Sequence, residues 1–281
     1  MKRYLSLITF SHTVFALPFA IIGFTLGITQ PGASFIWTDL LLVLACMVFA
    51  RSAAMAYNRY IDADLDKKNQ RTAQREIPKG IITPKNALFF VIANSIAFMI
   101  AAGLLNMLCF YLSPIALLVI LGYSYTKRFT WLCHFILGIG LALAPIGAYI
   151  AVTETFQTIP IIFSLIVFTW VSGFDIIYAL QDEDFDKANN LYSVPAKLGK
   201  SNAIIVSIIV HFNTALLVWY AGMYPLFGTL YWVGSAIFVA MLIYQHLIVK
   251  PNDLSKVNRA FFTANGIASV LFGIFVVMDL L

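Results

Sequence analysis

Residues 38–66 read TDLLLVLACMVFARSAAMAYNRYIDADLD. The first twenty of them are almost continuously apolar, with Asp39 and Arg51 as the exceptions. About 20 apolar residues are what a helix needs to cross the hydrocarbon core of a bilayer. The last nine residues, 58–66, carry one asparagine and three aspartates. The stretch therefore predicts a transmembrane helix that ends in an acidic cluster.

The rest of the chain repeats this apolar pattern. Of its 281 residues, 61% are hydrophobic and only 11% charged, with a mean hydropathy of +0.87. A soluble domain needs a largely polar exterior, so this composition favours the bilayer as solvent. The apolar runs are continuous rather than alternating, which favours helices over a spanning barrel. We expect one all-α, membrane-embedded domain over 1–281, with nine transmembrane helices near 10–29, 38–57, 86–105, 107–125, 130–152, 159–180, 202–222, 227–248 and 260–280.

Charge sets the expected orientation. With the N-terminus inside, all eighteen Lys and Arg residues fall in inner segments or at the helix ends beside them. The outer loops carry only acids, Asp39 and Glu154. This positive-inside bias predicts a multi-pass protein with the N-terminus and the two long loops in the cytoplasm. The expected location is a bacterial-type inner membrane. The bias also accounts for the net charge of +5, so no nucleic-acid partner is expected; the oligomeric state is left open.

The two long inner loops, 58–85 and 181–201, both begin with acids at helical spacing. Asn58, Asp62 and Asp66 lie four residues apart, and Asp182 and Asp186 repeat the step. On a continuing helix each set shares one face. Carboxylate and amide oxygens suit Mg²⁺, and neither cluster contains a His or Cys for zinc. The alternative is a pair of solvated helix ends. The acids off the shared faces are expected to face solvent: Asp64, Glu183 and Asp184.

Basic residues accompany the acids on the same side of the membrane. Arg and Lys bind phosphate oxygens directly, whereas carboxylates reach them through Mg²⁺. Acids and bases in the same loops therefore predict a metal–diphosphate site. Each single basic residue has a plainer alternative role as a topology anchor. The basic residues that lie near the acids are Lys67, Arg71, Arg75, Lys127, Arg128 and Lys187.

A common offset relates the two halves of the chain. Asn58 and Asp182 are 124 residues apart, as are Asp62 and Asp186. We therefore expect a parallel pseudo-repeat, roughly 1–129 and 130–250 plus a last helix, that brings both clusters to one central cavity.

Two ionisable residues within the spans, Arg51 and Asp175, show the same offset. Ionisable groups at membrane depth usually face a cavity or a partner, so we expect both to line the substrate site, either separately or as an ion pair. Tyr178 shares the Asp175–Asp182 face. Its ring could stabilise a carbocation, although ordinary packing is the commoner role of an aromatic residue.

At this point a resemblance becomes clear. NRYIDADLDKKNQRTAQREIPKG (58–80) resembles the first signature of the UbiA superfamily of intramembrane prenyltransferases, and YALQDEDFD (178–186) resembles the second. HTVFALPFA (12–20) and YSYTKRFT (123–130) also look like family segments. The resemblance implies nine helices around a central cavity and transfer of a prenyl chain from a polyprenyl diphosphate to an aromatic ring. It also implies that Mg²⁺ and the diphosphate are held by Asn58, Asp62, Asp66, Asp182 and Asp186, and that Arg51 and Asp175 occupy motif positions. From the basic residues near the acids, the resemblance selects Arg71, Arg75, Lys127 and Arg128 as the expected phosphate-binding residues.

The acceptor is a finer question. RSAAMAYNR (51–59) looks like a branch labelled 4-hydroxybenzoate polyprenyltransferase-like, and it has Arg59 where many members have Asp. The resemblance thus implies Mg²⁺-dependent prenylation of 4-hydroxybenzoate in quinone biosynthesis. Prenylation of aminodeoxyfutalosine, or of another aromatic of menaquinone biosynthesis, is the alternative. Outside this class, a secondary transporter would also combine a duplicated bundle with buried ionisable groups.

Overall fold

The computed structural model describes residues 15–281, which contain helices and one isolated bridge between Lys250 and Asp253. These residues form two compact units. The helices of unit 1, which spans Trp37–Tyr125, are α3 (Trp37–Ile61), α4 (Ala63–Lys68), α5 (Pro84–Leu105) and α6 (Met107–Thr126). Those of unit 2, whose described residues are 15–36 and 126–281, are α2 (Leu17–Ile28), α7 (Cys133–Thr153), α8 (Thr158–Ala179), α9 (Glu183–Ala188), α10 (Val194–Gly222), α11 (Thr229–Ile248) and α12 (Asn265–Leu280).

The expected all-helical membrane architecture is confirmed. Within the described residues, eight helices are long and apolar enough to cross a membrane, and α2 is a shorter apolar helix of 12 residues. They correspond one by one to the nine expected spans. The first span, 10–29, lies partly outside the described residues, and its described part contains α2.

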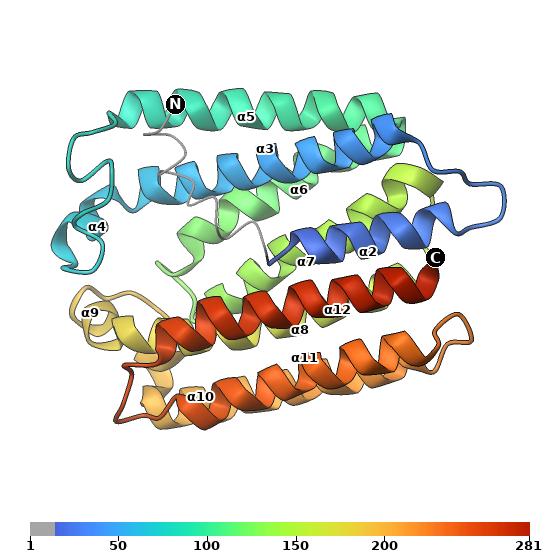
Figure 1. Ribbon diagram of the computed structural model, residues 1–281. Helices are drawn as coiled ribbons and strands as arrows, with labels where there is room; N and C mark the ends of the chain where they lie inside the picture. Colours follow the sequence, from blue (N-terminus) through green and yellow to red (C-terminus); the bar gives the residue numbers. More distant parts are fainter. Residues whose placement is uncertain (1–14) are drawn as a thin grey trace. The chain divides into compact units, whose positions relative to one another are not determined.

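Unit 1 is built on the packing of α3 against α5 (Figure 1). Small side chains allow the two helices to approach, and Ala56 and Ala87 are both fully buried. Ile77, Ile82 and Val91 complete this core. The opposite face of α5 is an exposed apolar stripe, as expected of a helix that faces lipid; it comprises Phe89, Ile92, Ile96, Ile100 and Leu104.

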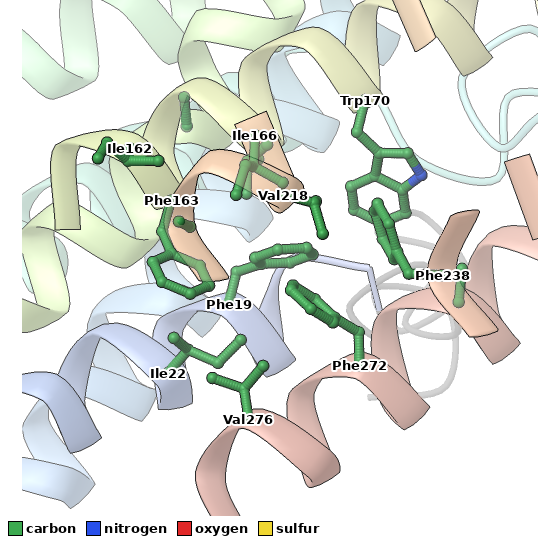
Figure 2. Packing of buried hydrophobic residues seen from close by; sticks show 14 of the residues in the cluster. Phe19, Ile22, Ile162, Phe163, Ile166, Trp170, Val218, Phe238, Phe272 and Val276 are labelled. Carbon is green, nitrogen blue, oxygen red and sulfur yellow. The ribbon is translucent and has the colours of Figure 1, made fainter. Parts of the chain in front are cut away.

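Unit 2 has an aromatic core (Figure 2). Phe19 of α2 packs against Trp170 of α8, with ring centroids 5.3 Å apart, and Phe238 of α11 packs against Phe272 of α12 at 4.9 Å. All four side chains are completely buried. The core therefore joins helices from both ends of the chain, and α12 contacts both α11 and α2 (Figure 1).

The start of α10 differs from expectation. The helix begins at Val194, eight residues before the predicted span, because Ser193 caps it by accepting a hydrogen bond from the Ala196 N–H (3.2 Å) and Pro195 fits the first turn. Gly199 then interrupts the helix with φ 79° and ψ 162°. Only glycine adopts this backbone conformation readily. A short first turn is thereby separated from the long, apolar part of α10.

Candidate active site

The first acidic cluster lies where α3 ends. The helix stops at Ile61, and Asp62 has φ −90° and ψ 5° before the six-residue helix α4. The i+4 hydrogen bonds nevertheless continue through the bend, from the Asp62 N–H to Asn58 O (3.0 Å) and from the Asp66 N–H to Asp62 O (2.7 Å). The expected spacing on one helical face is therefore largely kept. The Asn58 amide donates to Asp62 Oδ2 (3.2 Å), which leaves the amide oxygen of Asn58 as the group able to bind a cation.

Asp66 has a basic partner from the following loop. Nη1 of Arg75 lies 2.7 Å from Asp66 Oδ1 and 2.9 Å from Oδ2. The Thr72 hydroxyl donates to the backbone carbonyl of Asp66 (3.2 Å) and so holds the loop against α4. Asp62 and Asp66 are 1% and 5% exposed, respectively. They are therefore not a solvated helix end. Arg71 of the same loop is exposed.

The second cluster has the same local design. α8 ends at Ala179, a 3₁₀ turn covers Leu180–Asp182, and Asp182 precedes the six-residue α9 with φ −103° and ψ 1°. Asp186 accepts a hydrogen bond from the Ser193 hydroxyl (2.8 Å) and interacts electrostatically with Asp182 and Lys127. In unit 2, Lys127 is thus the expected basic residue that interacts with an acid of the second cluster. Arg128, the other basic residue expected in this unit, follows Lys127 in the sequence and is half-buried.

The local backbone refines the offset between the halves. Asp62 and Asp182 each stand immediately before a six-residue helix, with closely similar dihedral angles. Asp66 and Asp186 follow four residues later in each case. The backbone conformation therefore matches Asp62 with Asp182, at an offset of 120 residues. The sequence pattern had instead matched Asp62 with Asp186, at an offset of 124 residues. The duplication of the chain stays a prediction.

The residues expected deeper in the spans also have partners. Asp175 lies on α8, and its Oδ2 is 2.7 Å from Nδ1 of His134 on α7. Arg51 on α3 interacts electrostatically with Tyr123 on α6, and its buried Nε has no hydrogen-bond partner among residues 15–281. Tyr178 packs against Phe261, with ring centroids 4.2 Å apart. Arg51 belongs to unit 1 and Asp175 to unit 2, so their ion pair stays a prediction.

One expectation about the acids was wrong. Glu183 does not face solvent: its side chain is 8% exposed and is paired with Lys187 (2.5 Å, Oε1) and Lys200 (3.9 Å, Oε2). A buried carboxylate needs such partners. Asp64 and Asp184 are exposed, as expected.

The two clusters, each at the exit of an apolar helix, correspond to a known family. The model of the UbiA prenyltransferase family matches residues 16–267. The chain belongs to the UbiA prenyltransferase family. The match includes every candidate site residue described above and thus confirms the resemblance that the two acidic signatures indicated.

Individual relatives agree with the family match. The chain is 27% identical over 236 residues to 4-hydroxybenzoate octaprenyltransferase of Aliivibrio fischeri strain MJ11, covering 84% of this chain and 82% of that protein. It is 31% identical to the apo structure of a UbiA homolog from Aeropyrum pernix K1, with a TM-score of 0.84 over 96% of this chain and 98% of that one. A UbiA homolog from Archaeoglobus fulgidus bound to GPP and Mg²⁺ shares the fold, with a TM-score of 0.76 at 22% identity over 99% of both chains.

The donor atoms of the clusters fit a hard cation. Within residues 15–281, no three His, Cys, Asp or Glu side chains lie close enough together to hold a metal ion by themselves. Mg²⁺ does not need such a set, because it usually takes one or two carboxylates and completes its shell with phosphate oxygens and water. The oxygens of Asn58 and Asp62 in unit 1, and of Asp182 and Asp186 in unit 2, meet this requirement. Asp66 is the least available, because Arg75 binds both of its oxygens.

Sequence reasoning missed two residues that support the site, His134 and Ser193. His134 is only 3% exposed and lies in an apolar span, where a single histidine has no distinctive spacing. Ser193 did carry a signal: a serine two residues before Pro195 is typical of a helix N-cap and would have placed the start of α10 correctly.

Proposed function

We propose that the protein is an intramembrane enzyme that transfers a polyprenyl chain from a polyprenyl diphosphate to 4-hydroxybenzoate with Mg²⁺. The observation that carries the proposal is the pair of acidic clusters at the exits of α3 and α8, each with basic residues in its own unit. Relatives named 4-hydroxybenzoate octaprenyltransferase support the acceptor. The Archaeoglobus fulgidus homolog, bound to GPP and Mg²⁺, supports the donor and the cation.

The donor half of the reaction is an electrostatic problem. The bond between the allylic carbon and the diphosphate oxygen breaks, and its electron pair leaves with the diphosphate. Bound Mg²⁺ would supply a Lewis acid for this charge. In unit 1, Asn58 and Asp62 would bind the cation and Arg71 would bind phosphate oxygens. In unit 2, Asp182 and Asp186 would bind the cation, and Lys127 and Arg128 would bind phosphate oxygens. Arg75 holds Asp66 in place and adds a positively charged side chain beside the first cluster.

Arg51 is the residue best suited to the acceptor. A guanidinium at membrane depth needs an anionic partner, and 4-hydroxybenzoate carries a carboxylate. Nε of Arg51 is buried and has no hydrogen-bond partner within residues 15–281, so it can donate to such a ligand. Arg presents its N–H groups in a fixed fork that matches a carboxylate, which makes the contact selective as well as favourable.

The same proposal includes the orientation in the membrane. The Lys and Arg residues lie in the predicted inner segments or at the helix ends beside them, and two of these segments carry the acidic clusters, whereas the predicted outer loops have no Lys or Arg. The positive-inside rule supports a cytoplasmic location for the clusters, and we propose that the membrane is a bacterial inner membrane. A water-soluble diphosphate and acceptor ring would enter there, while the prenyl tail stays in the apolar region between the helices.

The direct test uses membranes that contain the protein, a radiolabelled prenyl diphosphate and a panel of acceptors that includes 4-hydroxybenzoate and aminodeoxyfutalosine. We expect labelled product with 4-hydroxybenzoate, dependence on added Mg²⁺, and complete loss with EDTA that excess Mg²⁺ restores. Product with aminodeoxyfutalosine alone would overturn the acceptor and keep the reaction class. No Mg²⁺-dependent transfer to any aromatic acceptor would overturn the function.

Replacing Arg51 by Gln should weaken acceptor binding selectively. A hydrogen bond to a charged group is worth about 1.5–3 kcal/mol, so we expect KM for 4-hydroxybenzoate to rise about 10- to 100-fold. The KM of the prenyl diphosphate should stay within about twofold of wild type, since Arg51 is assigned to the other substrate.

Steady-state kinetics with a second acceptor sharpens the Arg51 test. 4-Hydroxybenzamide has the same ring and hydroxyl but no carboxylate. The wild type should use it poorly, and Arg51→Gln should change its kcat/KM by less than about threefold. An equal loss with both acceptors would mean that Arg51 does not recognise the carboxylate.

Replacing Arg75 by Lys should test the support of Asp66. Lys keeps the charge but cannot reproduce the two-oxygen contact of a guanidinium. Asp66 would remain almost fully buried, with a poorer partner, so we expect turnover to fall about tenfold and the melting temperature to fall by a few degrees. Lys79→Ala, an exposed change in the same loop, is the control and should alter neither quantity. Wild-type values for Arg75→Lys, measured by prenyl transfer and thermal unfolding, would contradict the prediction.

A further inference from the structure

His134 connects three helices of unit 2 near the second cluster. Its ring lies at the first turns of α7 and is 3% exposed. Nδ1 is 2.7 Å from Asp175 Oδ2 on α8, and Nε2 is 3.3 Å from the backbone nitrogen of Val194, the first residue of α10. A buried imidazole with partners at both nitrogens has one fixed orientation.

These two contacts also determine which nitrogen carries the proton. The Val194 N–H can only donate, so Nε2 of His134 must accept with its lone pair. A neutral imidazole has one N–H, which is therefore on Nδ1 and donates to Asp175 Oδ2. The imidazole thus acts on Asp175 as a hydrogen-bond donor and holds its Oδ2 in place.

Asp175 itself is suited to contact a ligand. Its side chain is 22% exposed, so it is neither sealed in the core nor freely solvated. Only Oδ2 has a hydrogen-bond partner among the described residues, which leaves Oδ1 for another group. With Oδ2 anchored by His134, the direction of Oδ1 is fixed as well.

The same short turn of α10 supports the metal-binding acid. Val194 follows Ser193, whose hydroxyl donates to Asp186 Oδ2 (2.8 Å). The backbone and side chain of two adjacent residues therefore contact His134 and Asp186. Asp175 and Asp186 are thus connected through His134, Val194 and Ser193, although no hydrogen bond among the described residues joins the two carboxylates directly.

We propose that His134 is a positioning residue that orients the Asp175 carboxylate for the acceptor half of the reaction. The inference rests on the proposed function and names the acid that completes it. As the donor's C–O bond breaks, the ring carbon ortho to the phenolic hydroxyl forms the new C–C bond. The C–H bond at that carbon then breaks, its electron pair restores the aromatic ring, and the proton passes to Oδ1 of Asp175. His134 transfers no proton in this step.

Two substitutions of His134 separate positioning from structural support. In His134→Asn, the amide nitrogen stands near the place of Nδ1 and can still donate to Asp175, but the contact with Val194 is lost. In His134→Phe, both contacts are lost while the ring volume is kept. Positioning predicts that Asn retains activity that Phe loses, whereas a purely structural role at Val194 predicts equal losses.

The expected effects are specific to the acceptor. A misplaced catalytic group costs up to about 100-fold, so His134→Phe should lower kcat/KM for 4-hydroxybenzoate by about 10- to 100-fold. His134→Asn should stay within about fivefold of wild type, and both variants should keep the KM of the prenyl diphosphate within about twofold. Asp175→Asn should lose at least as much as His134→Phe, and His134→Phe in the Asp175→Asn background should cause little further loss.

His211 offers a matched control, because it is also 3% exposed in unit 2 and has partners at both nitrogens, His246 and the Trp170 carbonyl. His211→Phe should lower the melting temperature without changing acceptor kcat/KM per folded enzyme. The proposal is overturned if His134→Asn and His134→Phe lose activity equally, if donor KM changes as much as acceptor kcat/KM, or if neither variant has an effect. If the wild type does not prenylate 4-hydroxybenzoate, that result counts against the proposed acceptor instead. The His134 variants would then be compared on the acceptor that the wild type does use. If the wild type prenylates no acceptor, both the proposed function and this inference are overturned.

Discussion

Asp62→Asn should lower kcat/KM for prenyl transfer by roughly a thousandfold or more while the protein stays folded. The change keeps the size of the side chain and removes one negative charge from the site proposed to hold Mg²⁺ and diphosphate. Stabilising the charge on the leaving diphosphate is the main catalytic task in the proposed reaction. In other enzymes, removing a single uncharged hydrogen-bond donor that stabilises transition-state charge lowers kcat by about 10²- to 10³-fold. Asp62 is 1% exposed, so water cannot replace its charge effectively.

Asp64 provides the control for Asp62. It lies two residues further along the same short segment, and its side chain is exposed. Asp64→Asn makes the same chemical change and should leave turnover and melting temperature within error of wild type. Rates measured across a Mg²⁺ titration would show whether the loss in Asp62→Asn lies in cation binding or in turnover at saturation. Equal rates for the two variants would remove Asp62 from the site.

Gly23→Ala should cause the largest loss of stability. A Cβ at position 23 of α2 would overlap the carbonyl oxygen, carbonyl carbon and Cα of Pro145 on α7. These are backbone atoms, so no side-chain rotation relieves the overlap and the two helices must separate. Overpacking of a core costs about 1–3 kcal/mol and occasionally more, and we expect the upper end or beyond, because two helices that share the core of unit 2 must move apart.

Thermal unfolding of the purified protein in detergent measures this effect. Gly147→Ala is the matched control, since it adds the same methyl group to a helical glycine of α7 that has nothing within 4 Å of the new atom. A helical Gly→Ala change without a clash is favourable by about 0.5–1 kcal/mol, so Gly147→Ala should keep or raise the melting temperature. An equal melting temperature for Gly23→Ala and wild type would contradict the close approach of α2 and α7.

The spans could be predicted from the sequence because bilayer thickness imposes their length, and helical spacing alone selected Asn58, Asp62 and Asp66. What could not be predicted depends on contacts between residues distant in the chain. Glu183 has one partner at helical spacing, Lys187, but its second partner, Lys200, follows a helix break that sequence periodicity does not show. The partnership of His134 with Asp175 joins residues 41 positions apart on different helices. The start of α10 was missed for another reason: an apolarity criterion ignores a polar first turn, although its capping residues are visible.

Gly199 has a mechanical consequence for the site. The short turn before it carries the contacts of Ser193 and Val194 with Asp186 and His134, while the long part of α10 after it lies in the apolar region. A spanning helix changes its tilt when the bilayer becomes thicker or thinner. At Gly199 the backbone leaves the helical conformation (φ 79°, ψ 162°), so the short turn and the long segment meet at a kink formed by a residue that has little steric restriction. We therefore expect tilting of the long segment to change the backbone angles at this kink first and to leave the contacts of Ser193 and Val194 in place.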